Sequence, residues 1–203
     1  MEENQYNKKS VPQELQFILL LEEMKKIERM TPVLGANRKE NDAEHSWQIA
    51  SMALFLKDRT KLNINIDKVI KMLLVHDIVE VFAGDTFAYD IKANEDKEER
   101  ENESLKKVKE YLTYENAELL ESLWREFDAQ ETDDSKFANA MDRLAPLFLN
   151  IQTGNGGTWT DNNVKLSQVL KRAEPIKHLD DSIYEYIENE IFKACEKGFI
   201  IKD

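Results

Sequence analysis

The chain has 203 residues, of which 41% are hydrophobic, and its 40 acidic side chains outnumber 28 basic ones to give a formal net charge of −12. This length and composition predict one globular domain with a substantial core, and the negative charge disfavours general nucleic-acid binding, since no basic stripe can displace phosphate counterions. A small phosphorylated ligand is still compatible with this charge, because a metal ion and local arginines can reverse the sign of the potential inside a cleft.

The first half of the chain is dominated by helical periodicity. Pro12 suits a first helical turn, and apolar spacing extends this helix to about Met30. A polar loop follows, and Asp42 is the expected N-cap of a second helix that ends near residue 57 or 59. Asp67 is the expected cap of a third helix, and residues 76–82 either continue it or begin another turn.

The second half of the chain is also helical in pattern. Residues 93–112 are rich in charge but keep an apolar stripe, which predicts a solvated helix, and residues 115–127 form another amphipathic segment. Asp133 and Asp134 are the expected caps of a helix that extends to about Gln152 despite Pro146.

The sequence at the end of the chain predicts a loop and two helices. Residues 154–160 hold the only glycine cluster, which favours a loop over a ligand site, with Trp159 packed at its base. Helices are expected over residues 164–173 and 180–197. No β-alternation is evident, so the predicted fold class is all-α.

The sequence shows no sign of secretion or membrane insertion. The single cysteine, Cys195, excludes an intramolecular disulfide, and neither a leader pattern nor an apolar run long enough to span a bilayer occurs. We therefore expect a cytoplasmic protein without a membrane partner. We expect residues 1–10 to form a flexible N-terminus and residues 11–203 to fold as a single domain.

Titratable side chains interrupt three of the predicted apolar stripes. His45 heads the stripe of the second helix, His76 continues the stripe of the third, and Asp142 lies in the apolar stripe of a later helix. Buried ionisable groups are costly unless they are paired or bind a metal. The sequence therefore predicts that these helices meet around one divalent cation, with the ligands His45, His76, Asp77 and Asp142.

Each of these residues also has a simpler interpretation. A histidine next to an aspartate is common by chance, and a lone histidine on an apolar face is more often a hydrogen-bonded core residue. Glu80 could be a salt-bridge partner and Asp85 a turn residue after Gly84. Two histidines and two carboxylates on separate stripes favour the metal site, whereas His178 lies in a polar turn and is left out of it.

The combination of these residues resembles the HD-domain phosphohydrolase superfamily, and more narrowly its 5′-deoxynucleotidase branch. The resemblance covers about residues 15 to 175. It rests on several motifs at characteristic spacing: Arg38, Glu44-His45-Ser46, His76-Asp77-Ile78-Val79-Glu80, Gly84-Asp85 and Asp142-Arg143-Leu144. It implies a single HD-domain helical bundle with the metal site at its centre, usually in a homodimer.

The resemblance also implies a reaction and a set of roles. Members of this branch release phosphate from deoxyribonucleoside 5′-monophosphates with one divalent ion, for which the sequence leaves Mn, Co, Mg, Fe, Ni and Zn open. Glu80 and Asp85 match the catalytic carboxylates, and Arg29 the arginine that orients the phosphate; Arg38 is a second candidate for substrate binding. Family members commonly carry a tryptophan soon after that arginine, where this chain has Met30-Thr31-Pro32.

Two other functions are compatible with the sequence. One is an HD-type phosphodiesterase or pyrophosphohydrolase that acts on signalling nucleotides. The other is a non-catalytic helical interaction module in which the metal only holds helices together. Glu80 and Asp85 beside the ligands disfavour the module, because a purely structural site would close its coordination sphere and need neither.

Overall fold

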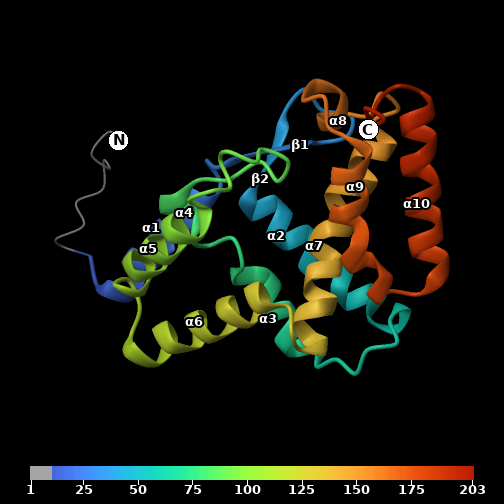
Figure 1. The fold of residues 1–203 in the computed structure, drawn as a ribbon. Helices are drawn as coiled ribbons and strands as arrows, with labels where there is room; N and C mark the ends of the chain where they lie inside the picture. Colours follow the sequence, from blue (N-terminus) through green and yellow to red (C-terminus); the bar gives the residue numbers. More distant parts are fainter. Residues whose placement is uncertain (1–10) are drawn as a thin grey trace.

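The computed structural model describes residues 11–203, in an architecture that is mainly helical (Figure 1). The predicted flexible segment, residues 1–10, lies outside the described residues. In chain order the elements are α1 Gln13–Met24, β1 Glu28–Pro32, β2 Lys39–Asn41, α2 Asp42–Leu56, the 3₁₀ turn η2 Lys57–Arg59, α3 Ile66–Val75, α4 Glu80–Ala83, α5 Lys97–Lys109, α6 Tyr114–Ala129, α7 Asp133–Gln152, α8 Thr158–Asp161, α9 Leu166–Ala173, the 3₁₀ turn η3 Glu174–His178 and α10 Asp181–Glu196.

A short antiparallel hairpin, formed by β1 and β2, replaces the end of the predicted first helix. The helix ends at Met24, so the expectation that it reaches Met30 is wrong. The predicted all-α fold class is confirmed, because two short strands are the whole of the sheet found within residues 11–203. Along β1 the inward-facing residues are Arg29 and Thr31, and both are buried. Because the buried side of this strand is polar, the hydrophobic alternation that normally reveals a strand is missing.

The helix caps lie one or more residues earlier than predicted. Asn41, not Asp42, caps α2: its side chain accepts a hydrogen bond from the Glu44 amide, and the Glu44 carboxylate accepts one from the Asn41 amide. Likewise Asn65 caps α3 and Thr132 caps α7, where Asp67 and the Asp133-Asp134 pair were expected. Asp42 is thereby freed from capping and is fully buried.

The larger core is built around α7, which contacts α2, α3, α6 and α10. Phe137, Ala138 and Met141 are fully buried in it. The helix runs through Pro146 to Gln152, as predicted, although proline cannot donate the usual backbone hydrogen bond.

A second, smaller core joins α1, α4, α5 and α6, the group on the left of Figure 1. Its buried residues include Ile78 and Val79, which come from the turn between α3 and α4, together with Leu105 and Trp124. The turn at residues 76–79 thus connects the two cores. Any polar side chain on this turn is held between them.

The glycine-rich segment forms a tight turn into α8, so the predicted loop is present over residues 154–157, whereas residues 158–160, also predicted as loop, begin a short helix. A Cβ atom on Gly157, whose φ is +50°, would approach Asn150 Oδ1 to 2.5 Å, so this position requires glycine. Trp159 is fully buried, and its Nε1 donates a hydrogen bond to Tyr89 Oη at 3.3 Å. This contact fixes the loop that follows α4 against the second half of the chain.

Candidate metal centre

Four side chains from distant parts of the chain converge at the junction of the two cores. His45 comes from the first turn of α2, His76 and Asp77 from the turn after α3, and Asp142 from the middle of α7. His45 Nε2 lies 2.9 Å from Asp142 Oδ1, and His76 Nε2 lies 3.8 Å from the same oxygen. Asp77 Oδ2 lies 3.0 Å from His76 Nε2 and 4.0 Å from His45 Nε2. The structure therefore brings together the four residues predicted as ligands.

The donor atoms are arranged as a divalent cation would require. His76 Nδ1 is hydrogen-bonded to the Leu73 carbonyl at 2.9 Å, which leaves Nε2 to face the cluster. That Nε2 is buried without a hydrogen-bond partner, since its short contact with Asp77 is poorly aligned for a hydrogen bond. One ligand atom from each of His45, His76 and Asp142 lies within 4.8 Å of the others. This group could hold a metal ion.

The charges of these residues are strongly coupled. Burial lowers the pKa of His76, but Asp77 and Asp142 outweigh burial and raise it to about 9. Burial opposes the ionisation of Asp77, but His76 and Arg29 hold its pKa below the usual range. Asp142 also has a lowered pKa, because Arg143 and the two histidines overcome the effect of burial. Both aspartates are therefore carboxylates, the form that binds a cation.

Arg29 lies next to this cluster, on β1 and not at the end of a helix as predicted. Its Nη1 donates to Asp77 Oδ2 at 2.6 Å and to Asp42 Oδ1 at 3.2 Å, and its Nε is 3.4 Å from Glu40 Oε1 without forming a hydrogen bond. Burial lowers the pKa of Arg29, but the surrounding carboxylates, Asp77 first among them, raise it well above its ordinary value. Arg29 is thus a permanently charged guanidinium inside the pocket.

Sequence reasoning missed Glu40 and Asp42 as members of this charged group. Asp42 is completely buried, and burial and the nearby Asp77 raise its pKa to about 7. Glu40 faces inward from β2, opposite Arg29 on β1. Recognising a hairpin with a polar inner face would have been the signal for both residues.

Glu80, the first residue of α4, lies in the same pocket, but its pKa is shifted in the opposite direction from that of Asp77. Its Oε2 is buried without a hydrogen-bond partner and lies 3.9 Å from Arg29 Nη1. Burial, followed by repulsion from Asp77, raises the pKa of Glu80 well above its usual value, and Arg29 only partly opposes this. The protonated form of Glu80 is therefore favoured more than that of a carboxyl group in water, as is common for proton-transferring residues in enzyme sites.

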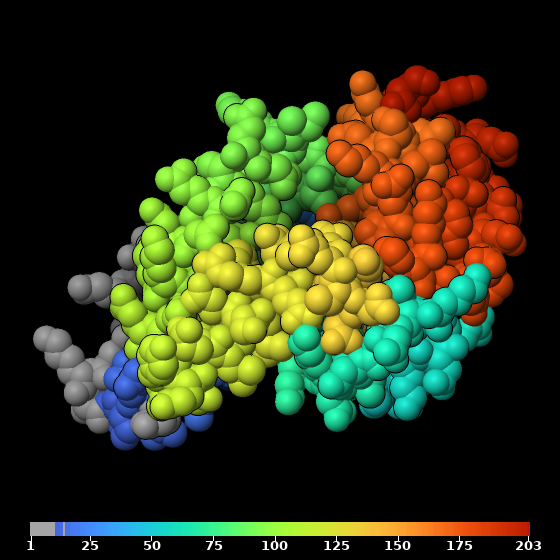
Figure 2. Space-filling view, turned by 60° about the horizontal axis from the view of Figure 1, so that its bottom comes forward, coloured from blue at the N-terminus to red at the C-terminus, as the bar shows by residue number. Residues whose placement is uncertain are grey.

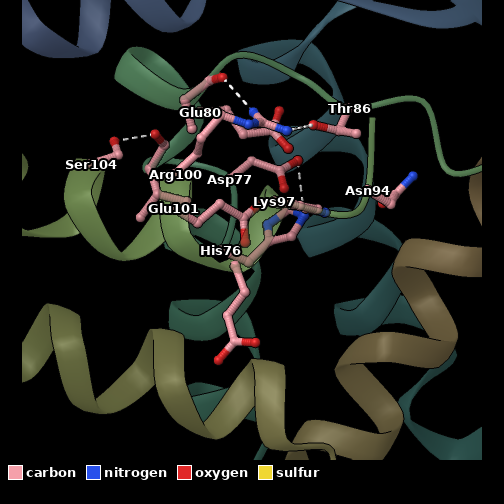
Figure 3. Close-up of polar contacts among 12 residues, drawn as sticks. His76, Asp77, Glu80, Thr86, Asn94, Lys97, Arg100, Glu101 and Ser104 are labelled. Atoms are coloured by element: carbon pink, nitrogen blue, oxygen red, sulfur yellow. Dashed lines mark hydrogen bonds and ion pairs between the residues drawn. The ribbon is translucent and has the colours of Figure 1, made fainter. Parts of the chain in front are cut away.

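Asp85 lies in the loop after α4, and Arg100 on α5 holds this loop in place. The Arg100 guanidinium donates to the Ala83 carbonyl at 2.8 Å and to Thr86 Oγ1 at 3.0 Å (Figure 3). It also donates to the Ala93 carbonyl at 3.0 Å. Burial raises the pKa of Asp85, although Arg29 opposes the shift. Asp85 is thereby fixed at the edge of the pocket.

The structure does not bring Arg38 into the pocket. Its guanidinium makes a two-pronged ion pair with Glu44, with both N–O distances 2.7 Å, and about half of the side chain is exposed. The two residues sit at the outer end of the hairpin and at the start of α2. Arg29, not Arg38, is the arginine next to the metal cluster.

The pocket itself has a volume of about 160 Å³ and is walled by several segments of the chain. Figure 2 shows the hollow between residues of the 75–100 region, the 125–145 region and the segment around α9. The Phe127 ring packs 4.8 Å from the His76 ring, and Trp124 and Asp128 line the same wall. Lys97 and Glu101 also line the pocket, so the charge-rich helix α5 is not merely solvated.

Comparison with known protein families identifies the architecture. A family model described as HD domain matches residues 21–182. The chain belongs to the HD domain family. None of the helices within residues 11–203 is both long and apolar enough to cross a membrane.

Individual proteins resemble this chain over about two thirds of its length or more. The human 5′-deoxynucleotidase HDDC2 is 31% identical over 135 residues, which cover 66% of this chain and 65% of the human protein. The crystal structure of a predicted metal-dependent phosphohydrolase from Magnetospirillum magnetotacticum has a TM-score of 0.85 and 37% identity, and covers 93% of this chain and 94% of that chain. The PH0347 protein of Pyrococcus horikoshii has a TM-score of 0.61 at 28% identity, over 88% of this chain and 98% of that chain.

Proposed function

We propose that this HD domain protein is a metal-dependent phosphomonoesterase that hydrolyses deoxyribonucleoside 5′-monophosphates to deoxynucleoside and phosphate. The observation that carries the proposal is the convergence of two histidines and two carboxylates beside a pocket that also holds an arginine and a glutamate with one oxygen lacking a hydrogen bond. The names of the human and Magnetospirillum relatives support the same reaction class. The matched part spans about 65% of the human protein, so the activity is transferred here as a proposal.

In this proposal four residues hold one divalent ion: His45, His76, Asp77 and Asp142. When bound, the ion would polarise the phosphoryl group and acidify the attacking water, so that no serine or cysteine nucleophile is needed. Their imidazole and carboxylate donors suit Mn, Co, Mg, Fe, Ni or Zn. The donors alone do not select among these ions, and metal analysis must identify the native one.

The remaining groups orient the substrate and move protons. Arg29, a charged guanidinium on the wall of the pocket, would bind an oxygen of the phosphate and neutralise part of its charge. Water attacks phosphorus, the bond between phosphorus and the 5′-oxygen breaks, and the 5′-oxygen must take up a proton. Glu80, with its raised pKa, can supply that proton and recover one from the water, while Asp85 helps to hold the water or the sugar.

A nucleotide panel tests this proposal directly. Purified protein should contain a divalent metal and release phosphate from deoxynucleoside 5′-monophosphates but leave diesters and polyphosphates intact. Glu80→Gln should lose turnover and keep the metal, whereas Glu98→Gln, an exposed substitution at the start of α5, should change neither. Full activity in Glu80→Gln would refute the assigned proton carrier. Cleavage of diesters or pyrophosphates alone would replace the proposal with the HD-type phosphodiesterase or pyrophosphohydrolase alternative, and no turnover with any supplied metal would favour the non-catalytic module.

We also propose that the protein is a cytoplasmic homodimer. The surface between α2, α7 and α10 carries an apolar groove that includes Met52, Phe148 and Tyr186, and nearby Phe55 is 81% exposed. Burying such a patch is the usual function of a subunit interface. Light scattering should give twice the mass of one chain, and the double variant Phe55→Asp, Tyr186→Asp should shift the measured mass towards that of a single chain. A monomeric wild-type protein at micromolar concentration would refute the proposal.

A further inference from the structure

A second cavity adjoins the candidate metal centre and is larger than it. This cavity has a volume of about 670 Å³ and lies between the loop after α4, α7 and α9. It shares part of its wall with the first pocket, including Tyr89, Arg143 and Arg172. The hollow in Figure 2 opens between these same regions of the chain. A ligand bound at the metal cluster can therefore extend into the second cavity.

The charge of this cavity is opposite to that of the whole molecule. Four cationic side chains line it, Lys136, Arg143, Lys171 and Arg172, against the single carboxylate Glu174. The chain as a whole has a net charge of −12. Among the described residues, none forms a hydrogen bond or ion pair with the side chains of Lys136, Lys171 or Arg172. Cationic side chains therefore outnumber carboxylates four to one on the wall of this cavity.

Arg172 shows this imbalance most clearly. It projects from α9 into both cavities, where its charge is close to that of Arg143. Burial, followed by repulsion from Arg143, lowers the pKa of Arg172 to about 10. Arg143 has partners of its own, because it is paired with Asp142 and donates to Asn139 Oδ1 at 3.4 Å. The Arg172 guanidinium is therefore available to bind an anion by two parallel hydrogen bonds.

We propose that the basic cavity binds a second phosphate group of the substrate, and that the preferred substrate is a nucleoside 3′,5′-bisphosphate. The proposal rests on the proposed function, in which the 5′-phosphate lies at Arg29 and the metal cluster. The 3′-phosphate of the same molecule then meets Arg172, with Lys136 and Lys171 at the outer wall. Only the 5′-phosphate is cleaved, because the metal ligands and Glu80 surround that end alone.

The test measures binding separately from turnover. Calorimetric titration in the Glu80→Gln background, which prevents turnover, compares a deoxynucleoside 3′,5′-bisphosphate with its 5′-monophosphate, its 3′-monophosphate and inorganic phosphate. The bisphosphate should bind about tenfold or more tightly than the 5′-monophosphate, as expected from an added charged hydrogen bond. Arg172→Gln and Lys171→Gln should each remove most of this advantage, and Lys171→Gln, which lies outside the metal-site pocket, should change 5′-monophosphate affinity by less than about twofold. Lys106→Gln, an exposed charge loss on α5 outside both cavities, should change neither.

Three outcomes would overturn the proposal. The first is equal affinity of the protein without cavity substitutions for the bisphosphate and the 5′-monophosphate. The second is an equal loss of affinity for both ligands in Lys171→Gln. The third is binding of inorganic phosphate as tightly as the bisphosphate, which would make the cavity a site for free anions. Lys171 is exposed, so its variant decides the matter even where Arg172→Gln fails to fold. Absence of turnover with every nucleotide would refute the proposed function, whereas the titration would still decide the binding preference.

Discussion

Removing the Arg100 side chain should loosen the loop that carries Asp85 without disturbing the metal ligands. The guanidinium joins two ends of this loop, since it bonds the Ala83 carbonyl and Thr86 on one side and the Ala93 carbonyl on the other. It also pairs with Asp96 at 2.9 Å, but Asp96 is largely exposed. The four metal-ligand candidates lie on α2, α7 and the turn after α3, outside this loop.

The magnitude follows from the three hydrogen bonds to partly buried acceptors. Hydrogen bonds to charged groups contribute roughly 1.5–3 kcal/mol each, but the freed carbonyls can bind water, so we expect Arg100→Ala to cost about 2–3 kcal/mol in total. The exposed pair with Asp96 adds at most about 1 kcal/mol. For a chain of this size the melting temperature should fall by about 5–10 °C.

Three measurements check this reasoning. Hydrogen exchange should accelerate over residues 84–96, phosphate release should fall, and the metal content should stay as in the wild type. Arg125→Ala is the matched control, because this arginine makes an exposed ion pair with Glu121 on its own helix and should cost less than about 1 kcal/mol. If Arg100→Ala melted like Arg125→Ala and exchanged like the wild type, the loop would not depend on Arg100 and the argument would fail.

Other substitutions test the core, a helix cap, an ion pair and the metal. Phe137→Ala, at a fully buried position on α7, should destabilise the fold by about 3–5 kcal/mol in urea titration. Asn41→Ala removes the capping box of α2 and should cost about 1 kcal/mol, with weaker metal binding because His45 lies in that first turn. The hydrogen bond from Arg59 lowers the pKa of Asp180. The ionised carboxylate therefore stabilises the fold above about pH 4, the pKa in the unfolded chain, and this stabilisation is lost as pH falls through the lowered pKa. Asp180→Asn, which can still cap α10, should make the melting temperature depend less on pH in this acid range. Chelation should lower the melting temperature of the wild type more than that of His45→Ala, since a metal that binds only the native state stabilises it.

The convergence of the candidate ligands was predictable because each interrupts an apolar pattern. His45, His76 and Asp142 occur where a helix should bury a hydrophobic residue, so a search for hydrophobic periodicity exposes them as exceptions. The members of one site could then be chosen by asking which of these titratable residues lie on helix faces that pack together. This reasoning needs helices that are otherwise regular, and α2, α3 and α7 satisfy that condition.

The polar hairpin and the basic cavity were not predictable by the same reasoning. Arg29 lies on a strand whose inner side is polar, so no hydrophobic alternation marks it. Arg100 lies in a run of mixed charges, where one functional arginine is indistinguishable from its solvated neighbours. Arg172 becomes conspicuous only when the tertiary structure buries it beside Arg143, whose repulsion outweighs the attraction of Asp142. The role of such a residue depends on which side chains surround it in the folded protein, and the neighbouring sequence does not show this.

The buried carboxylates give a common physical explanation for the two halves of the proposed site. Five acidic side chains, Glu40, Asp42, Asp77, Glu80 and Asp142, are buried or nearly so around one buried arginine, Arg29. Uncompensated carboxylates in such a place either take up protons or bind cations. Asp42 and Glu80 follow the first course, as their raised pKa values indicate, whereas Asp77 and Asp142 stay ionised. The same burial that raises the pKa of Glu80 therefore favours a divalent cation next to it, and a bound cation would in turn lower that pKa.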